Sequence, residues 1–405
     1  MIPQMSTTRA AVILGLLAAV GPFAIDMYLP ALPALAADLR TSASAAQATL
    51  FVFFLAFGVS QIFYGPIADS VGRRPPLYFG LGLYIVGALC SAAAPSIGWL
   101  IGARLVQGVG AAATMVMPRA VVRDMVTGVE ATRLMGFIML VLSVSPILAP
   151  AVGGVLVSWI SWRAIFVSLL LAAAVAFGLV RFFLPETLDP KNRTPLNMGA
   201  VLRSYGELLM HARFLGLTFI GGAGMAAFFA FLATSPFLFI EHYGLSANQF
   251  SLCFGLNAGV FIGVSQLAAP LAGRFGVEAV VKVAVAGFVA FSSLMALVYG
   301  LGAESLFLLI PMLMASFGCL GLVIGPTAVL SLDEQGERAG LASALGGALQ
   351  MVCGMVSIGI VSLLPKDDAR WLTFAIAAAA LIAGVLTVFT LGGARRPQPT
   401  QAAAE

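Results

Sequence analysis

Residues Ala10 to Ile25 form an apolar run of sixteen positions without an ionisable side chain. As a helix, this run would rise about 24 Å, which is most of the hydrocarbon core of a bilayer. Asp26 follows in the same run, where a carboxylate costs about 2.5–3.5 kcal/mol on insertion scales and normally faces a bundle interior or a wet cavity. We therefore interpret Asp26 as a proton or cation site. The alternative is a helix-end residue that snorkels to the membrane interface, because Pro30 can end the helix.

The composition excludes an ordinary soluble domain. Hydrophobic residues make up 60% of the chain and charged residues 9%, whereas soluble proteins carry about 25% charged residues. The net charge of +4 is not a nucleic-acid signal, because the basic residues do not cluster on one soluble segment. The four cysteines lie in apolar runs without a CxxC spacing, which indicates buried thiols and no metal site or disulfide framework. They are Cys90, Cys253, Cys319 and Cys353.

The alternation of apolar runs and short polar loops predicts an all-α membrane protein with twelve transmembrane helices. The first six spans are expected at about Ala10–Ala31, Thr49–Ala68, Leu77–Ala94, Gly98–Met117, Leu134–Val157 and Ala164–Leu184. The last six are expected at about 214–240, 249–271, 279–301, 305–330, 339–364 and 371–392. This arrangement predicts two pseudo-symmetric six-helix bundles (1–184 and 214–394), joined by a cytoplasmic linker (185–213) and followed by a disordered tail (395–405).

Charge and internal similarity support this map. With the N-terminus in the cytoplasm, sixteen of the 21 Lys and Arg residues lie on the cytoplasmic side and four on the other side, so the positive-inside rule predicts that both termini are cytoplasmic. Gly110 precedes Pro118 by eight residues, and Gly318 precedes Pro326 by the same eight. An offset of 208 residues between the two pairs favours parallel repeats of six helices, which is a transporter plan.

A short charged turn separates the second and third spans. Asp69 is expected at a helix C-terminus, where the helix dipole disfavours an anion, so it needs a partner. That partner is either an arginine or the N-terminus of another helix, and the start of the eleventh span near Arg338–Gly340 is one such N-terminus. The marked residues of the turn are Gly65, Asp69, Gly72, Arg73 and Arg74.

Two further motifs lie inside predicted spans. In the fourth span, Arg104 is a second intramembrane charge, and Gln107 lies three residues later on the same helix face. The fifth span carries two prolines and a glycine pair, which predict a bent helix with neighbours close to its backbone. These residues are Pro146, Pro150, Gly153 and Gly154.

With these motifs the chain resembles the major facilitator superfamily, whose signature loop matches the charged turn with its spacing intact. The Arg104 motif resembles that of proton-coupled members, and the proline-glycine motif resembles that of drug antiporters, although Ser145 and Ala149 stand where glycine is typical. The run from Asp26 to Pro30 most resembles the twelve-helix drug/proton antiporters of the bicyclomycin-resistance and chloramphenicol-efflux (Bcr/CflA) subfamily. In the second half, the loop signature is reduced to Gly273–Gly276, which lacks the acid.

The resemblance and the residues together suggest site roles. Asp26 and Arg104 are expected at similar depth in one half, where a change in their separation or hydration would couple proton binding to conformation. The alternative for Arg104 is a static tie between helices through backbone carbonyls. Substrate contacts are expected from Tyr28, Gln107, Phe231 and Asn257, and the charged turn is implied to be the conformational-switch loop.

The expected function is secondary active efflux of small antibacterial compounds of the chloramphenicol or bicyclomycin kind, in exchange for protons. The expected partners are the drug, protons and the lipid bilayer of the bacterial inner membrane, with no nucleic acid, no metal, no cofactor beyond the proton gradient, and a monomeric chain. The alternative is a proton-coupled importer of a small nutrient or metabolite. An enzyme is not expected, because the sequence holds no Ser/His/Asp, HExxH or phosphate-cradling pattern.

Overall fold

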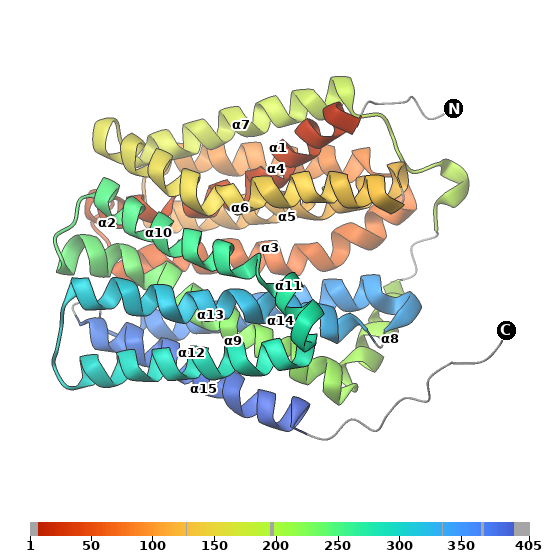
Figure 1. Cartoon of the computed structure of the whole chain (residues 1–405). Helices are drawn as coiled ribbons and strands as arrows, with labels where there is room; N and C mark the ends of the chain where they lie inside the picture. Colours follow the sequence, from red (N-terminus) through yellow and green to blue (C-terminus); the bar gives the residue numbers. More distant parts are fainter. Residues whose placement is uncertain (1–6, 127, 195–197, 334, 366–367, 393–405) are drawn as a thin grey trace.

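The computed structural model describes residues 7–126, 128–194, 198–333, 335–365 and 368–392. Within these ranges the chain forms helices joined by short turns, and it contains no strand. Twelve of the described helical segments are long and apolar enough to cross a bilayer, which confirms the predicted all-α membrane fold. Figure 1 shows these segments running side by side along one common direction. The predicted tail at 395–405 lies outside the described residues.

The helices follow the predicted order. The first half contains α1 (Thr7–Asp26), η1 (Leu29–Ala31), α2 (Leu32–Asp38), α3 (Ala43–Val71), α4 (Arg74–Ala92), α5 (Ile97–Met125), α6 (Gly128–Trp159) and α7 (Trp162–Phe183). The segment between the halves contains η2 (Pro190–Asn192) and α8 (Met198–Leu209). The second half contains α9 (Ala212–Pro236), the π-helix η3 (Phe237–His242), α10 (Ala247–Ser265), α11 (Ala268–Phe275), α12 (Val277–Gly300), α13 (Leu306–Leu332), η4 (Gly336–Arg338), α14 (Ala339–Ser362) and α15 (Ala369–Leu391).

Serine side chains set the starts of three long helices. Ser42 accepts a hydrogen bond from the N–H of Ala45 at the start of α3 (3.2 Å), and Ser96 does the same at the start of α5. Ser246 and Gln249 form a reciprocal capping box at the start of α10. Each serine satisfies a backbone donor that the first turn of a helix leaves without a partner.

Two predicted spans are interrupted helices. The first span continues to Asp38, beyond the expected end at Ala31, but its α-helix breaks after Asp26. Pro30, one turn further, has no N–H to donate to the carbonyl of Asp26, which removes one helical hydrogen bond at this break. The eighth span divides between α10 and α11, where Pro270 likewise cannot donate to the carbonyl of Gln266.

Glycines let three helices of the first half touch backbone to backbone. A Cβ atom on Gly108 of α5 would overlap the carbonyl oxygen of Phe53 on α3. A Cβ atom on Gly110 would overlap the carbonyl oxygen of Gly80 on α4. Small residues allow such close approach in membranes, where association depends on packing and not on the hydrophobic effect. The result is a tightly packed trio of α3, α4 and α5.

The halves meet along α3 with α14 and α6 with α10. Figure 1 shows that α1 begins and α15 ends at one end of the bundle, here called the termini end. Three side-chain hydrogen bonds join the halves toward the opposite end. They are Ser44 Oγ to the Ser362 carbonyl (2.5 Å), Gln47 Nε2 to the Ala233 carbonyl (2.7 Å) and Ser251 Oγ to the Pro150 carbonyl (2.7 Å).

Candidate functional site

Arg104 lies fully buried among the helices of the first half. Its Nη1 atom donates to the carbonyl oxygen of Ala24 on α1 (3.2 Å) and to Oε1 of Gln107 (2.8 Å). The guanidinium carbon lies 4.1 Å from the ring centre of Phe53 and 4.8 Å from that of Tyr28. Aromatic faces attract a cation, so rings and carbonyl groups supply much of the stabilisation that water would give. The bond to the carbonyl of Ala24 ties α5 to α1 through the backbone, which is the alternative role considered for Arg104 in the sequence analysis.

Asp26 is the last residue of α1, and 6% of its surface is exposed. In the part of the chain that the structure describes, its carboxyl forms no hydrogen bond or ion pair. Arg104 reaches the carbonyl of Ala24, two residues earlier, and does not pair with Asp26 in this conformation. Arg104 of α5 therefore contacts α1 near Asp26 without pairing with it. An unpaired buried carboxyl has no countercharge to stabilise its ionised form.

The charged turn is built around Arg73, which is buried although it lies at the termini end. Its guanidinium pairs with Asp69 (2.6 Å) and forms two hydrogen bonds to the carboxylate of Asp124 at the end of α5 (2.6 and 3.1 Å). Burial lowers the pKa of Arg73, but these two carboxylates raise it, and the net pKa lies above its ordinary value. Arg123 lies 3.8 Å from Asp69. The partner expected for Asp69 is thus arginine in this conformation, and not the start of α14 near Arg338.

The other residues of the turn determine its backbone conformation and its contacts with α7. Gly72 has φ +103°, a conformation that favours glycine, and its N–H donates to the carbonyl of Ala68. Arg74 bonds the hydroxyl of Tyr78 and the carbonyl of Arg181. Gly65 meets no atom within 4 Å of the position of a Cβ, so the described contacts give no steric reason for glycine there.

The proline-glycine motif lies where α6 meets both α1 and α10. A Cβ on Gly153 would overlap the carbonyl oxygen of Met27, at the break after α1. A Cβ on Gly154 would lie 2.7 Å from Oγ of Ser251 on α10. The glycine pair therefore sets how closely the broken first span and the second half approach α6. The helix itself runs without interruption through Pro146 and Pro150.

A cavity of about 220 Å³ lies between α6 and three helices of the second half. Phe231 and Asn257, both predicted as substrate contacts, line it together with Pro146. The Oδ1 atom of Asn257 is buried without a hydrogen-bond partner among the described residues. The complete lining is Met139, Leu142, Ser143, Pro146, Phe228, Phe231, Phe254, Asn257, Ala258, Phe261, Ile262, Ser265 and Phe317. An aromatic wall with few polar groups is typical of sites for small, largely apolar ligands.

The other two predicted substrate contacts are not part of this lining. Tyr28 is fully buried, and its hydroxyl shares a hydrogen bond with Thr49 (2.9 Å) while its ring faces Arg104. Gln107 is also fully buried and bonds Arg104. Both belong to the Arg104 cluster. The spacing of Phe228 with Phe231 and of Phe254 with Asn257 marks one face of each helix, a signal that extends to Phe261 one turn further.

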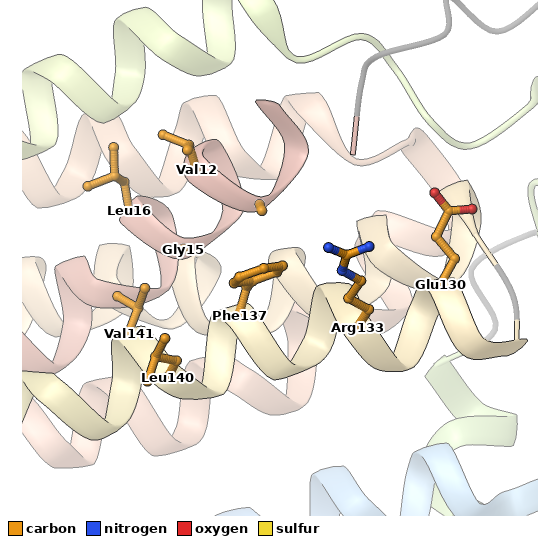
Figure 2. A pocket seen from close by; sticks show the side chains of 9 residues that line it. Val12, Gly15, Leu16, Glu130, Arg133, Phe137, Leu140 and Val141 are labelled. Carbon is orange, nitrogen blue, oxygen red and sulfur yellow. The ribbon is translucent and has the colours of Figure 1, made fainter. Parts of the chain in front are cut away.

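A separate groove of about 490 Å³ runs between α1 and α6 near the termini end. Figure 2 shows Val12 and Leu16 on α1 and Phe137 and Leu140 on the neighbouring α6, with the charged ends of Arg133 and Glu130 toward the start of α6. The aliphatic and aromatic residues named here are at least two-fifths exposed. The groove is therefore an outer furrow of the first half, distinct from the cavity between the halves.

Comparison with known proteins identifies the family of this chain. The model of the major facilitator superfamily matches residues 14–358. The chain belongs to the major facilitator superfamily. It is therefore a multi-pass membrane transporter and not an enzyme, as the sequence predicted.

Three bacterial relatives match nearly the whole chain. The uncharacterized MFS-type transporter YdgK of Bacillus subtilis is 33% identical over 87% of this chain and 88% of its own length. A bicyclomycin resistance protein homolog of Haemophilus influenzae is 31% identical over 94% and 95%. A chloramphenicol resistance protein of Pseudomonas aeruginosa is 30% identical over 94% and 90%. The last two confirm the predicted resemblance to the Bcr/CflA subfamily.

A solved structure confirms the fold. The crystal structure of a D-xylose-proton symporter superposes with a TM-score of 0.74, covering 95% of this chain and 97% of that chain at 15% sequence identity. At this identity the likeness shows the arrangement of the helices and does not identify the transported compound.

Proposed function

We propose that this transporter exports small, largely apolar antibacterial compounds from the cytoplasm in exchange for protons. The observation that carries the coupling is the buried carboxyl of Asp26, which has no partner among the described residues. Such a group can gain and lose a proton without breaking an ion pair, so its proton affinity responds to hydration and to the approach of Arg104. No cofactor or metal takes part in this scheme, and one chain is sufficient.

The cavity supports the class of substrate. Its wall is mainly aromatic and aliphatic, and the amide of Asn257 offers an unused acceptor. At about 220 Å³ the cavity is below the 300–1,000 Å³ typical of drug sites, so we infer that it widens when the halves move apart. The names of two relatives, which refer to bicyclomycin and chloramphenicol resistance, favour antibacterial compounds of that kind and favour export over uptake.

The charge distribution supports the direction. The termini end carries Arg73, Arg74 and Arg123, and by the positive-inside rule we assign it to the cytoplasm. The hydrogen bonds between the halves at the opposite end then hold the periplasmic side closed. We infer that this conformation loads substrate from the cytoplasm. Transport requires different drug affinities in the two open states, because equal affinity would shift nothing.

Coupling through one acidic residue makes a measurable distinction between substrates. Export of a neutral drug against one proton moves net positive charge inward, so it should respond to both membrane voltage and ΔpH. Export of a monocation against one proton should respond to ΔpH alone. Efflux of one compound of each kind from proteoliposomes, with valinomycin or nigericin collapsing one gradient at a time, tests this. Export that neither treatment slows would rule out proton antiport. Uptake of a compound with the proton gradient would instead establish the importer alternative.

A further inference from the structure

The first residues of the linker cap the N-terminus of α4. Pro75 and Pro76 occupy the first turn of α4 and carry no N–H, so only Arg73 and Arg74 offer free backbone donors there. Glu186, just beyond α7, accepts both: Oε1 from the N–H of Arg73 (2.8 Å) and Oε2 from that of Arg74 (3.1 Å). A single carboxylate thus satisfies every donor that the prolines leave, in a position where the helix dipole favours an anion.

The same carboxylate also explains Gly72. A Cβ at this position would lie 2.6 Å from Oε2 of Glu186, so any side chain would displace the cap. Two more linker contacts surround the turn. Thr187 donates to Oδ2 of Asp124 (3.3 Å), and the N–H of Thr194 donates to the backbone oxygen of Asp69 (3.1 Å). The start of the linker is therefore docked on the switch loop.

The end of the linker is docked on the other half. Tyr205 and Leu208 of α8 pack in one apolar cluster with Ala342 of α14. Glu207 of α8 pairs with Arg338, the residue that precedes α14 (2.5 Å). One segment thus contacts both halves at the termini end, and its first docked residue fixes the backbone that carries Arg73.

We propose that Glu186 is a positioning residue of the conformational switch. By capping α4, it holds Arg73 between Asp69 and Asp124, and Asp69 is then not available to its alternative partner, the start of α14. The cap thereby favours the conformation in which the halves touch at the end opposite the termini. The linker then influences the change between the two open conformations and does not merely connect the halves. This inference requires the alternating cycle of the superfamily, but it is independent of the drug and of proton coupling.

The test uses the full-length protein without any substrate. Hydrogen exchange on the peptide covering the start of α4 should be about fivefold faster in Glu186→Ala, because loss of a capping acceptor opens the first turn. Asp189→Ala is the matched control: this exposed linker acid, three residues away, accepts only the N–H of Lys191 within its own turn. Its exchange should equal that of the wild type. Glu186→Gln, which keeps one acceptor oxygen and loses the charge, should lie between them.

A second readout separates positioning from simple capping. Cysteines at positions 44 and 362, whose residues touch across the halves, should cross-link with a short thiol reagent about fivefold more slowly when Glu186→Ala is added. Adding Glu186→Ala to Arg73→Ala should slow it no further, because both changes act through one network. An unchanged cross-linking rate, or additive effects of the two substitutions, would overturn the proposal. If Glu186→Ala does not fold, the same comparisons with Glu186→Gln decide the matter.

Discussion

The guanidinium of Arg104 contacts the backbone of Ala24 across 3.2 Å. It thus joins α5 to the last turn of α1 immediately before Asp26, and it leaves that carboxyl without a countercharge. We propose that a shift of α1 relative to α5 exchanges the backbone carbonyl for the carboxylate as the partner of Arg104. Such an exchange would combine the two roles proposed for Arg104, a tie to α1 and coupling to Asp26, in one transport cycle.

Asp26→Asn should abolish proton-driven export while leaving the protein folded and inserted. The amide is isosteric but cannot carry a proton across the cycle. Drug efflux from energised vesicles measures the effect, and thermal unfolding of the purified protein checks the fold. Full proton-driven export by the Asn variant would eliminate Asp26 as the coupling residue.

Arg104→Ala should lower turnover at least about tenfold, because it removes the contact to Ala24 and a buried cation among three aromatic rings. Arg104→Lys should recover only part of the loss, since lysine keeps a charge but lacks the planar fork. Initial rates of drug transport at matched protein levels provide the comparison. If the alanine variant transports as well as the wild type, the residue has no role in the cycle.

Asp69→Asn should slow alternation about fivefold and leave equilibrium drug binding near its wild-type value. Asp69 lies at the termini end of α3, a helix that contributes no residue to the lining of the cavity, and its carboxylate pairs with Arg73 (2.6 Å). Binding and transport rate should therefore be measured on the same preparation. A parallel loss of both would indicate misfolding instead of slowed switching.

Gly153→Ala should lower the free energy of unfolding by about 1–3 kcal/mol, as expected for overpacking. The added methyl group would overlap the carbonyl oxygen of Met27, and backbone cannot move aside as a flexible side chain can. Gly136→Ala on the same helix is the control, because no atom lies within 4 Å of its added methyl group. Equal thermal stability of the two variants would contradict the close packing of α6 on α1.

Phe231→Ala should raise the KM for an apolar drug about tenfold and leave its proton dependence unchanged. Phe231 stacks on Phe254 (5.7 Å between ring centres) in the wall of the cavity, and it lies in the half that lacks both Asp26 and Arg104. Phe291→Ala, at an exposed position on α12, is the matched control. A lower turnover with unchanged KM would remove Phe231 from the binding surface.

Hydropathy and motif spacing predicted the helix order because a bilayer requires long apolar helices, and long apolar runs can be seen directly in the sequence. Pro30 marked the position of the break after Asp26 in the sequence. Whether a proline interrupts a helix, however, depends on neighbouring groups that bond the backbone carbonyls it leaves unpaired, and these come from distant parts of the chain. Local spacing placed Gln107 with Arg104, which it contacts. It did not place Tyr28 in that cluster, because this contact joins residues distant in sequence. The partnership of Glu186 with the switch loop was equally hidden, although two consecutive prolines at a helix start indicate that the remaining donors need an acceptor.

The glycine contacts of α5 with α3 and α4 have a mechanical consequence. Backbone pressed against backbone leaves no side chains that can rearrange at these crossings, so the trio would move as one stiff lever. Its two longest helices are α3 and α5, whose 29 residues each span about 43 Å. Pivoting near Ser44 by 5° would displace the turn at Asp69, about 37 Å along the helix, by about 3 Å relative to the second half. A very small rotation at one membrane surface would thus move the whole Arg73 network, with its ion pairs intact, relative to the second half at the other surface.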